Sequence, residues 1–154
     1  MTEYKRLKEE LTLHWVIVAV MVSMLFMYNL ICHFMGAEIQ ISMAEEQRVF
    51  IRTILYVVTI AVFPLTNLLR HILLRLNQTM PGDNPAKNRY LMTTIVTLAS
   101  IEIVGVFGFV MFVLGDGYNT LYIFTTLGAL GIFLHRPREQ EYKQIIAALK
   151  YQNK

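Results

Sequence analysis

The sequence has almost no cysteine and lacks the local motifs that mark common hydrolytic and phosphate-binding sites. It has one cysteine, Cys32, among 154 residues, so neither an intrachain disulfide nor a Cys-rich zinc or iron–sulfur site can form. It has no nucleophile elbow, no glycine loop for phosphate and no metalloprotease helix motif. Charged residues are also scarce, at 16% of the chain. We therefore expect a non-enzymatic protein without catalytic residues or a metal.

Apolar residues, in contrast, are abundant. They make up 55% of the chain, and the mean hydropathy of +0.46 is one that soluble domains of this size seldom sustain. With about 20 residues needed per crossing of a hydrocarbon core, four apolar stretches predict membrane spans at approximately 13–35, 49–74, 90–114 and 120–135. The first is too long for the apolar region of a signal peptide, and no small-residue cleavage site follows it.

The positive charges indicate how these spans are oriented. Basic residues cluster before the first span, around the second connection at 76–89 and after the fourth span. The first connection instead carries Glu38, Glu45 and Glu46, with Arg48 at its end, and the only charged residue of the third is Asp116. Because basic residues stay on the cytoplasmic side, both termini and the 76–89 loop are expected to be cytoplasmic. The net charge of +3 then reflects membrane topology and does not indicate nucleic-acid binding. We predict an all-α, four-transmembrane antiparallel bundle, one membrane domain over residues 1–154, in the bacterial cytoplasmic (inner) membrane.

Both ends of the chain have helical amphipathic patterns. Tyr4, Leu7 and Leu11 share one face before the first span, and apolar residues recur at helical spacing after Glu139. These patterns predict amphipathic N- and C-terminal flanking helices that lie either on the lipid or on a partner's surface.

Two further segments indicate how the spans pack. Residues 115–119, G-D-G-Y-N, predict a tight turn that makes the third and fourth spans an antiparallel hairpin. Small residues let membrane helices approach closely, and four glycines are placed to do so in this hairpin: Gly105, Gly108, Gly128 and Gly131.

Glu102 is the main candidate functional residue. It lies between two isoleucines near the middle of the third span, where a charged acid costs several kcal/mol even on lenient scales. We expect it to face the bundle interior or a partner, and either to be protonated or to hold a cation. Hydroxyl side chains expected near the same depth are possible supporting groups: Ser23, Thr59, Ser100, Thr125 and Thr126. The alternative is a neutral acid that only hydrogen-bonds two helices together.

The segment from Glu102 to Val110, E-I-V-G-V-F-G-F-V, with Ala99 before it, resembles the acid-bearing helix of the proteolipid, or c, subunit of rotary ATP synthases. The resemblance implies proton exchange at Glu102, and Ile103, which stands where sodium-binding members often have a hydroxyl residue, makes sodium the less favoured ion. The sequence departs from the family in its second span, which has Pro64 and no glycine. Duplicated four-span proteolipids also carry the acid on the last helix, not on the third.

Histidines provide a second constellation. His14, His71 and His135 are expected near the cytoplasmic ends of their spans, and two histidines at equal depth on facing helices would ligate haem b or help to bind a quinone.

Three functions are consistent with these features. The first is a small integral membrane protein with a protonatable glutamate at the bilayer midplane, acting as a non-enzymatic subunit of a membrane complex or as a homo-oligomer, with no cofactor. The second is proteolipid-like proton translocation. The third is a haem- or quinone-binding membrane anchor.

Overall fold

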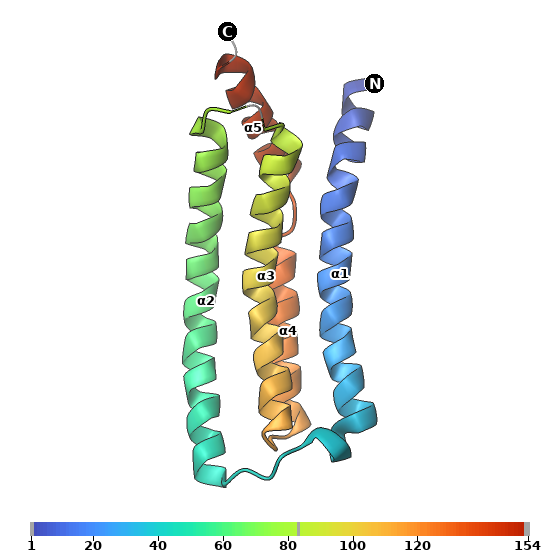
Figure 1. The fold of residues 1–154 in the computed structure, drawn as a ribbon, viewed down its shortest axis with the longest axis vertical. Coiled ribbons are helices and arrows are strands. Elements are labelled where there is room, and N and C mark those ends of the chain that lie inside the picture. The colour runs from blue at the N-terminus through green and yellow to red at the C-terminus, as the bar shows by residue number, and fades with distance from the viewer. Residues whose placement is uncertain (1, 83, 153–154) are drawn as a thin grey trace.

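The computed structural model describes residues 2–82 and 84–152, and in these residues it contains five helices and no strand. The helices are α1 (Thr2–Ile39), α2 (Glu45–Thr79), α3 (Ala86–Val113), α4 (Tyr118–Leu134) and α5 (Glu139–Gln152). The first four run side by side in alternating directions, and α5 lies at the end of the bundle where both termini are found (Figure 1). We call this the terminal end, and the opposite one the turn end. The prediction of an all-α protein is confirmed.

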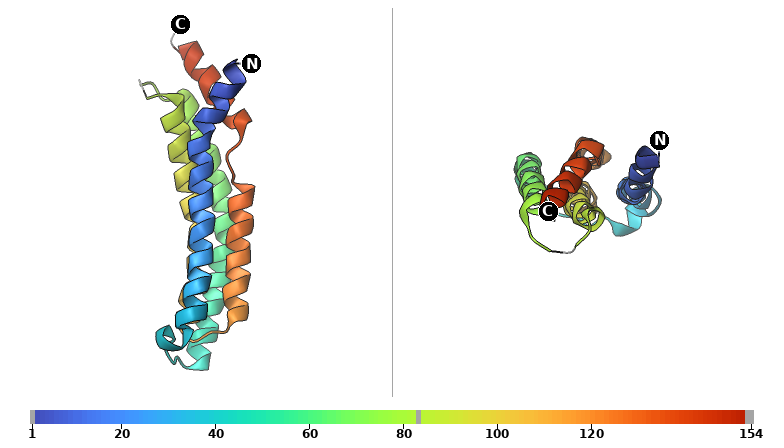
Figure 2. Two further views of the ribbon diagram at one scale, coloured as in Figure 1. Left: turned by 90° about the vertical axis from the view of Figure 1, so that its right-hand side faces the viewer. Right: turned by 90° about the horizontal axis from the view of Figure 1, so that it is seen from above.

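Helix α3 is the centre of the arrangement. It packs along α4, while α1 and α2 lie on opposite sides of it (Figures 1 and 2). The α3–α4 contact is close because it is built on glycines: a Cβ on Gly108 would lie 2.8 Å from Cβ of Phe124, and one on Gly128 would lie 3.4 Å from the backbone nitrogen of Gly105. The glycines of the predicted hairpin are therefore at the helix contacts.

Three of the helices are long and apolar enough to cross a membrane, namely Glu9–Ile39 within α1, α2 and α3. Helix α4 is equally apolar in character but has only 17 residues. The outer faces of α1 and α2 expose large apolar side chains, with Phe26 67%, Phe34 84% and Ile60 73% exposed. An extensive apolar surface of this kind requires lipid or another protein as its surroundings, which is compatible with an integral membrane protein.

The expected N-terminal flanking helix is not a separate element. Helix α1 is continuous from Thr2 to Ile39, and the physical reason is that no glycine or proline occurs between residues 2 and 35 to interrupt it. The side chains of Tyr4 and Leu7 lie outside the part of the chain whose side chains are described. The C-terminal flank is a separate helix, α5, because Pro137 in the preceding segment prevents α4 from continuing.

The second connection is shorter than the predicted loop at 76–89. Residues 76–79 continue α2 and residues 86–89 already belong to α3, so the non-helical part that the structure describes is limited to 80–82 and 84–85. The buried guanidinium of Arg89 organises this short connection. It donates hydrogen bonds to the carbonyl oxygens of Asn77, Met80, Gly82 and Asn84 at 2.7–3.2 Å. Asn77 lies in the last turn of α2, where carbonyls lack partners within the helix.

The tight turn between α3 and α4 is present. Gly115 has φ +90°, a backbone conformation that glycine adopts without a Cβ penalty. Two arginines of α2 hold the turn: Arg52 pairs with Asp116 at 3.1 Å, and Arg48 donates to the carbonyl oxygen of Gly115 at 3.1 Å.

Candidate functional site

Glu102 lies in the contact between α3 and α1. Residues three, four and seven positions away occupy the same face of a helix, and three residues at such positions from Glu102 meet α1. Leu98 packs with Leu25, a Cβ on Gly105 would overlap the side chain of Leu25, and the ring of Phe109 lies 5.6 Å from that of Tyr28. Packing of α1 leaves Glu102 only 6% exposed.

The carboxyl group of Glu102 has no partner in this contact. Neither of its oxygens makes a hydrogen bond with any described residue, and it takes part in no ion pair there. An ionised carboxylate without a donor in an apolar contact loses its hydration without compensation, whereas a neutral carboxylic acid loses much less. The geometry favours the neutral acid.

None of the five hydroxyl residues proposed to support Glu102 is bonded to it. Ser23 and Ser100 donate to carbonyl oxygens one turn earlier in their own helices, each at 2.8 Å, a local bond that hydroxyls in helices readily form. Thr125 accepts a hydrogen bond of 3.0 Å from the amide of Asn29. Thr59 is buried and has no hydrogen-bond partner in the part of the chain that is described, and Thr126 is exposed.

The register between helices explains why Thr125 does not reach Glu102. Gly105 faces Gly128, and Ile101 lies against Gly131, so Glu102 is level with the residues of α4 just before Gly131, about one and a half turns from Thr125. The midpoint of a hydrophobic stretch indicates depth only roughly, because the helices extend by different lengths beyond their apolar parts.

Sequence reasoning missed Tyr28 and Asn29, which contribute to α1 contacts near this site. Tyr28 packs against the apolar cluster of Leu25, Leu98, Ile101 and Ile132, and Asn29 bonds α1 to α4 through Thr125. A polar amide inside an apolar span was the available signal, since such groups usually bond across helices.

The structure gives the three predicted histidines different surroundings. His14 is fully buried, its ring 5.0 Å from that of Tyr90, and neither of its ring nitrogens has a hydrogen-bond partner among the described residues. His71 is exposed, and Nδ1 of His135 lies 2.9 Å from the carbonyl oxygen of Gly131. In the part of the chain that is described, no group of three or more His, Cys, Asp or Glu side chains is placed to hold a metal ion.

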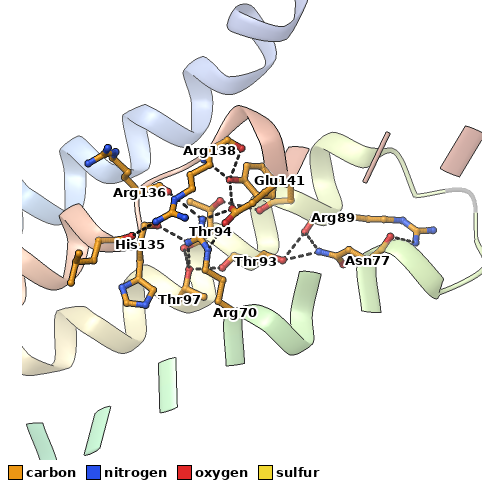
Figure 3. Close-up of polar contacts among 12 residues, drawn as sticks. Arg70, Asn77, Arg89, Thr93, Thr94, Thr97, His135, Arg136, Arg138 and Glu141 are labelled. Atoms are coloured by element: carbon orange, nitrogen blue, oxygen red, sulfur yellow. Dashed lines mark hydrogen bonds and ion pairs between the residues drawn. The ribbon is translucent and has the colours of Figure 1, made fainter. Parts of the chain in front are cut away.

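A polar cluster at the terminal end was also missed, and it is drawn in Figure 3. The buried guanidinium of Arg70 donates to both carboxylate oxygens of Glu141, at 2.6 and 3.3 Å, and to the carbonyl oxygen of His135 at 2.6 Å. The hydroxyl of Tyr90 donates to Glu141 at 2.9 Å and accepts from the backbone amide of Arg138 at 2.7 Å. These bonds join α5 to α2 and α3. The available signal was a basic residue several positions inside an apolar span.

Tyr142 attaches α5 to α1 as well. Its hydroxyl donates to a carboxylate oxygen of Glu10, and its ring is 2% exposed. Burial raises the pKa of the Tyr142 hydroxyl above its ordinary value, and the hydrogen bond and negative charge of Glu10 act in the same direction.

Comparisons with models of known protein families, with curated proteins and with solved structures found no match. The resemblance of residues 99–110 to the proteolipid helix stays a prediction. Inferences about function therefore depend on the residues and contacts described above.

Proposed function

We propose that this protein is a small, non-enzymatic integral membrane protein that crosses the bilayer four times and carries Glu102 as a neutral, protonatable acid between α1 and α3. The observation that carries the proposal is the carboxyl group of Glu102, buried in an apolar helix contact without a hydrogen-bond partner. Both termini lie on the cytoplasmic side of a bacterial inner membrane in this proposal, as the distribution of basic residues predicts.

The fourth crossing is supported by the position of α5. Helix α5 is bonded to α2 through Arg70 and to α1 through Glu10, both at the terminal end. If α1, α2 and α3 each cross, the chain is at the turn end after α3 and must cross once more to bring α5 back. Helix α4 has 17 residues, a length of about 26 Å at 1.5 Å per residue, which nearly spans a core of roughly 30 Å.

Assembly with other subunits or with further copies is supported by the outer surfaces of α1 and α2. Large apolar side chains, among them Phe26, Phe34 and Ile60, are exposed along these helices. Because lipid tails are as apolar as these side chains, exposed side chains of this kind are accommodated either by lipid or by a further subunit, and the oligomeric state is measured in the membrane.

The same carboxyl group supports a second candidate, proton transfer through Glu102. A carboxyl that forms no fixed hydrogen bond exchanges its proton without first breaking one. Sodium binding has less support, because a bound cation needs several oxygen ligands, and none of the hydroxyl residues discussed above bonds to Glu102.

The experiment is carbodiimide modification of the protein in lipid vesicles, followed by mass spectrometry of the peptides. Carbodiimides react with protonated carboxyl groups, so we expect selective modification of Glu102 that declines as pH rises. Glu102→Gln, which keeps the size and the neutral charge, is the matched control and should remain folded and unmodified. Modification restricted to other carboxyl groups, or unfolding of Glu102→Gln, would contradict the proposal.

Proton flux into the same vesicles separates the two candidates. Transfer through Glu102 requires flux in the natural protein and its loss in Glu102→Gln. If Glu102 only packs between α1 and α3, neither the natural protein nor Glu102→Gln should show proton flux. Carbodiimide should still modify Glu102 selectively in the natural protein.

A further inference from the structure

A groove runs between α1 and α4 from the terminal end toward the middle of the bundle. The two helices lie side by side in the left view of Figure 2. The groove has a volume of about 490 Å³, and its walls are mainly apolar side chains of the two helices: Trp15, Val18, Val22, Ala129, Ile132 and Phe133. From Trp15 to Val22 the groove extends about 10 Å along α1 at 1.5 Å per residue, most of the depth of one leaflet of a core roughly 30 Å thick.

A cation lies at the terminal end of this groove. Arg136 follows the last turn of α4 and completes the lining, and its guanidinium carbon lies 4.2 Å from the centre of the Phe133 ring. The carbonyl oxygen of Arg136 accepts a hydrogen bond of 3.2 Å from Arg70, which holds its backbone in place. Among the described residues, Arg136 forms no ion pair.

Three acidic residues at the terminal end already have partners. Glu141 is paired with Arg70, Glu139 lies 3.7 Å from Lys143, and Glu10 accepts the hydrogen bond from Tyr142. The described residues that line the groove include no carboxylate to repel an anion. The groove therefore combines an apolar channel at membrane depth with one uncompensated positive charge where the headgroups lie.

We propose that this groove binds an anionic phospholipid, with one acyl chain between α1 and α4 and the phosphate group on Arg136. The guanidinium donates to phosphate oxygens in the forked geometry that suits them, and Trp15, 49% exposed, has the amphipathic ring typical of the membrane interface. Charge complementarity selects an anionic headgroup over a zwitterionic one. The inference rests on the proposed membrane setting but not on the chemistry of Glu102.

Trp15 is the only tryptophan of the chain, which makes it a specific probe of the groove. The experiment measures its fluorescence in phosphatidylcholine vesicles that contain a small mole fraction of either brominated phosphatidylglycerol or brominated phosphatidylcholine, since bromine quenches only nearby indole rings. We expect phosphatidylglycerol to bind about fivefold more tightly than phosphatidylcholine, which corresponds to about 1 kcal/mol for one arginine near an anionic lipid. Inorganic phosphate should not compete, because it lacks the acyl chain.

Three variants test the assignment. Arg136→Gln should abolish the preference for phosphatidylglycerol, and Ala129→Phe should do the same by filling the groove while the charge remains. Arg75→Gln removes an exposed arginine of α2, on the opposite side of α3 from α1, and should retain the preference. Circular dichroism of each variant checks that it is folded. If Arg136→Gln does not fold, Ala129→Phe still tests the groove.

The outcomes are separable. Equal quenching by the two lipids, or a preference that survives in folded Arg136→Gln and Ala129→Phe, would overturn the proposed lipid site. An equal loss in Arg75→Gln would show a general effect of surface charge and would overturn it as well. If neither lipid quenches Trp15, the membrane setting itself is wrong, which is distinct from failure of carbodiimide to modify Glu102.

Discussion

Arg70 of α2 and Glu141 of α5 form a buried ion pair in which Nη2 lies 2.6 Å from Oε2. Their side chains are 7% and 16% exposed, and the remaining donors of the guanidinium are used by Thr97 and by the carbonyl oxygens of His135 and Arg136. The pair holds the amphipathic helix α5 on the terminal end of the bundle. The sequence alone was also consistent with α5 lying on the lipid surface.

Glu141→Gln should weaken the attachment of α5. Removing one partner of a buried ion pair leaves the other charge uncompensated, which typically costs about 3–5 kcal/mol. Limited trypsin digestion of the protein in detergent should show faster cleavage after Arg136 or Arg138. Glu139→Gln is the matched control, because its pair with Lys143 is exposed and such pairs contribute about 0–1 kcal/mol. Equal cleavage of the two variants would contradict the assigned role of the Arg70–Glu141 pair.

Glu102→Leu should stabilise the protein. The substitution removes a buried polar group that has no partner, and leaving such a group unsatisfied costs about 1–3 kcal/mol. The free energy of unfolding, measured by denaturant titration in mixed micelles, should therefore rise. Thr125→Val is the comparison, since it removes the acceptor of the Asn29 bond and should lower the same free energy. A large loss of stability in Glu102→Leu would show that the carboxyl has a partner after all.

Gly108→Ala should destabilise the contact between α3 and α4. The new Cβ would lie 2.8 Å from Cβ of Phe124 and 3.1 Å from the carbonyl oxygen of Leu121, and neither atom moves without moving the backbone. Overpacking of this kind costs roughly 1–3 kcal/mol. Thermal unfolding followed by circular dichroism measures the effect. Gly117→Ala is the control, because a Cβ there meets nothing within 4 Å; a comparable loss in both variants would exclude the steric explanation.

The attachment of α5 to α1 should weaken in alkali. The pKa of Tyr142 is raised in the folded protein, so its hydroxyl stabilises the fold fully below the ordinary tyrosine pKa of about 10 and loses that contribution as pH rises above it. Stability measured against pH should fall above about pH 10, less steeply in Tyr142→Phe. Tyr151→Phe, which alters a tyrosine that is 81% exposed, should keep the slope of the natural protein. An unchanged slope in Tyr142→Phe would contradict this contribution.

Local sequence signals predicted those features that depend on local physical chemistry. The apolar stretches predicted the helices, because burial of backbone groups in apolar surroundings requires them to be satisfied within the helix. Gly115 and Pro137 predicted the breaks before α4 and α5. The predicted lengths were less accurate. The expected N-terminal flank is part of α1, and the second connection is shorter than predicted. Arg89 binds carbonyl groups across that connection, a contact that no local sequence pattern predicts.

The candidate site likewise has features that the sequence predicted and features that depend on contacts between helices. The sequence by itself determined that the chain is helical, that it is apolar enough for a membrane and that Glu102 sits where a charge is costly, because these follow from composition and helical period alone. Only the tertiary structure decided that Glu102 faces α1 without a partner, that the nearby hydroxyls bond elsewhere, and that Arg70 binds Glu141. Those outcomes depend on the register and rotation of helices against one another, which arise from side-chain packing between residues far apart in the chain.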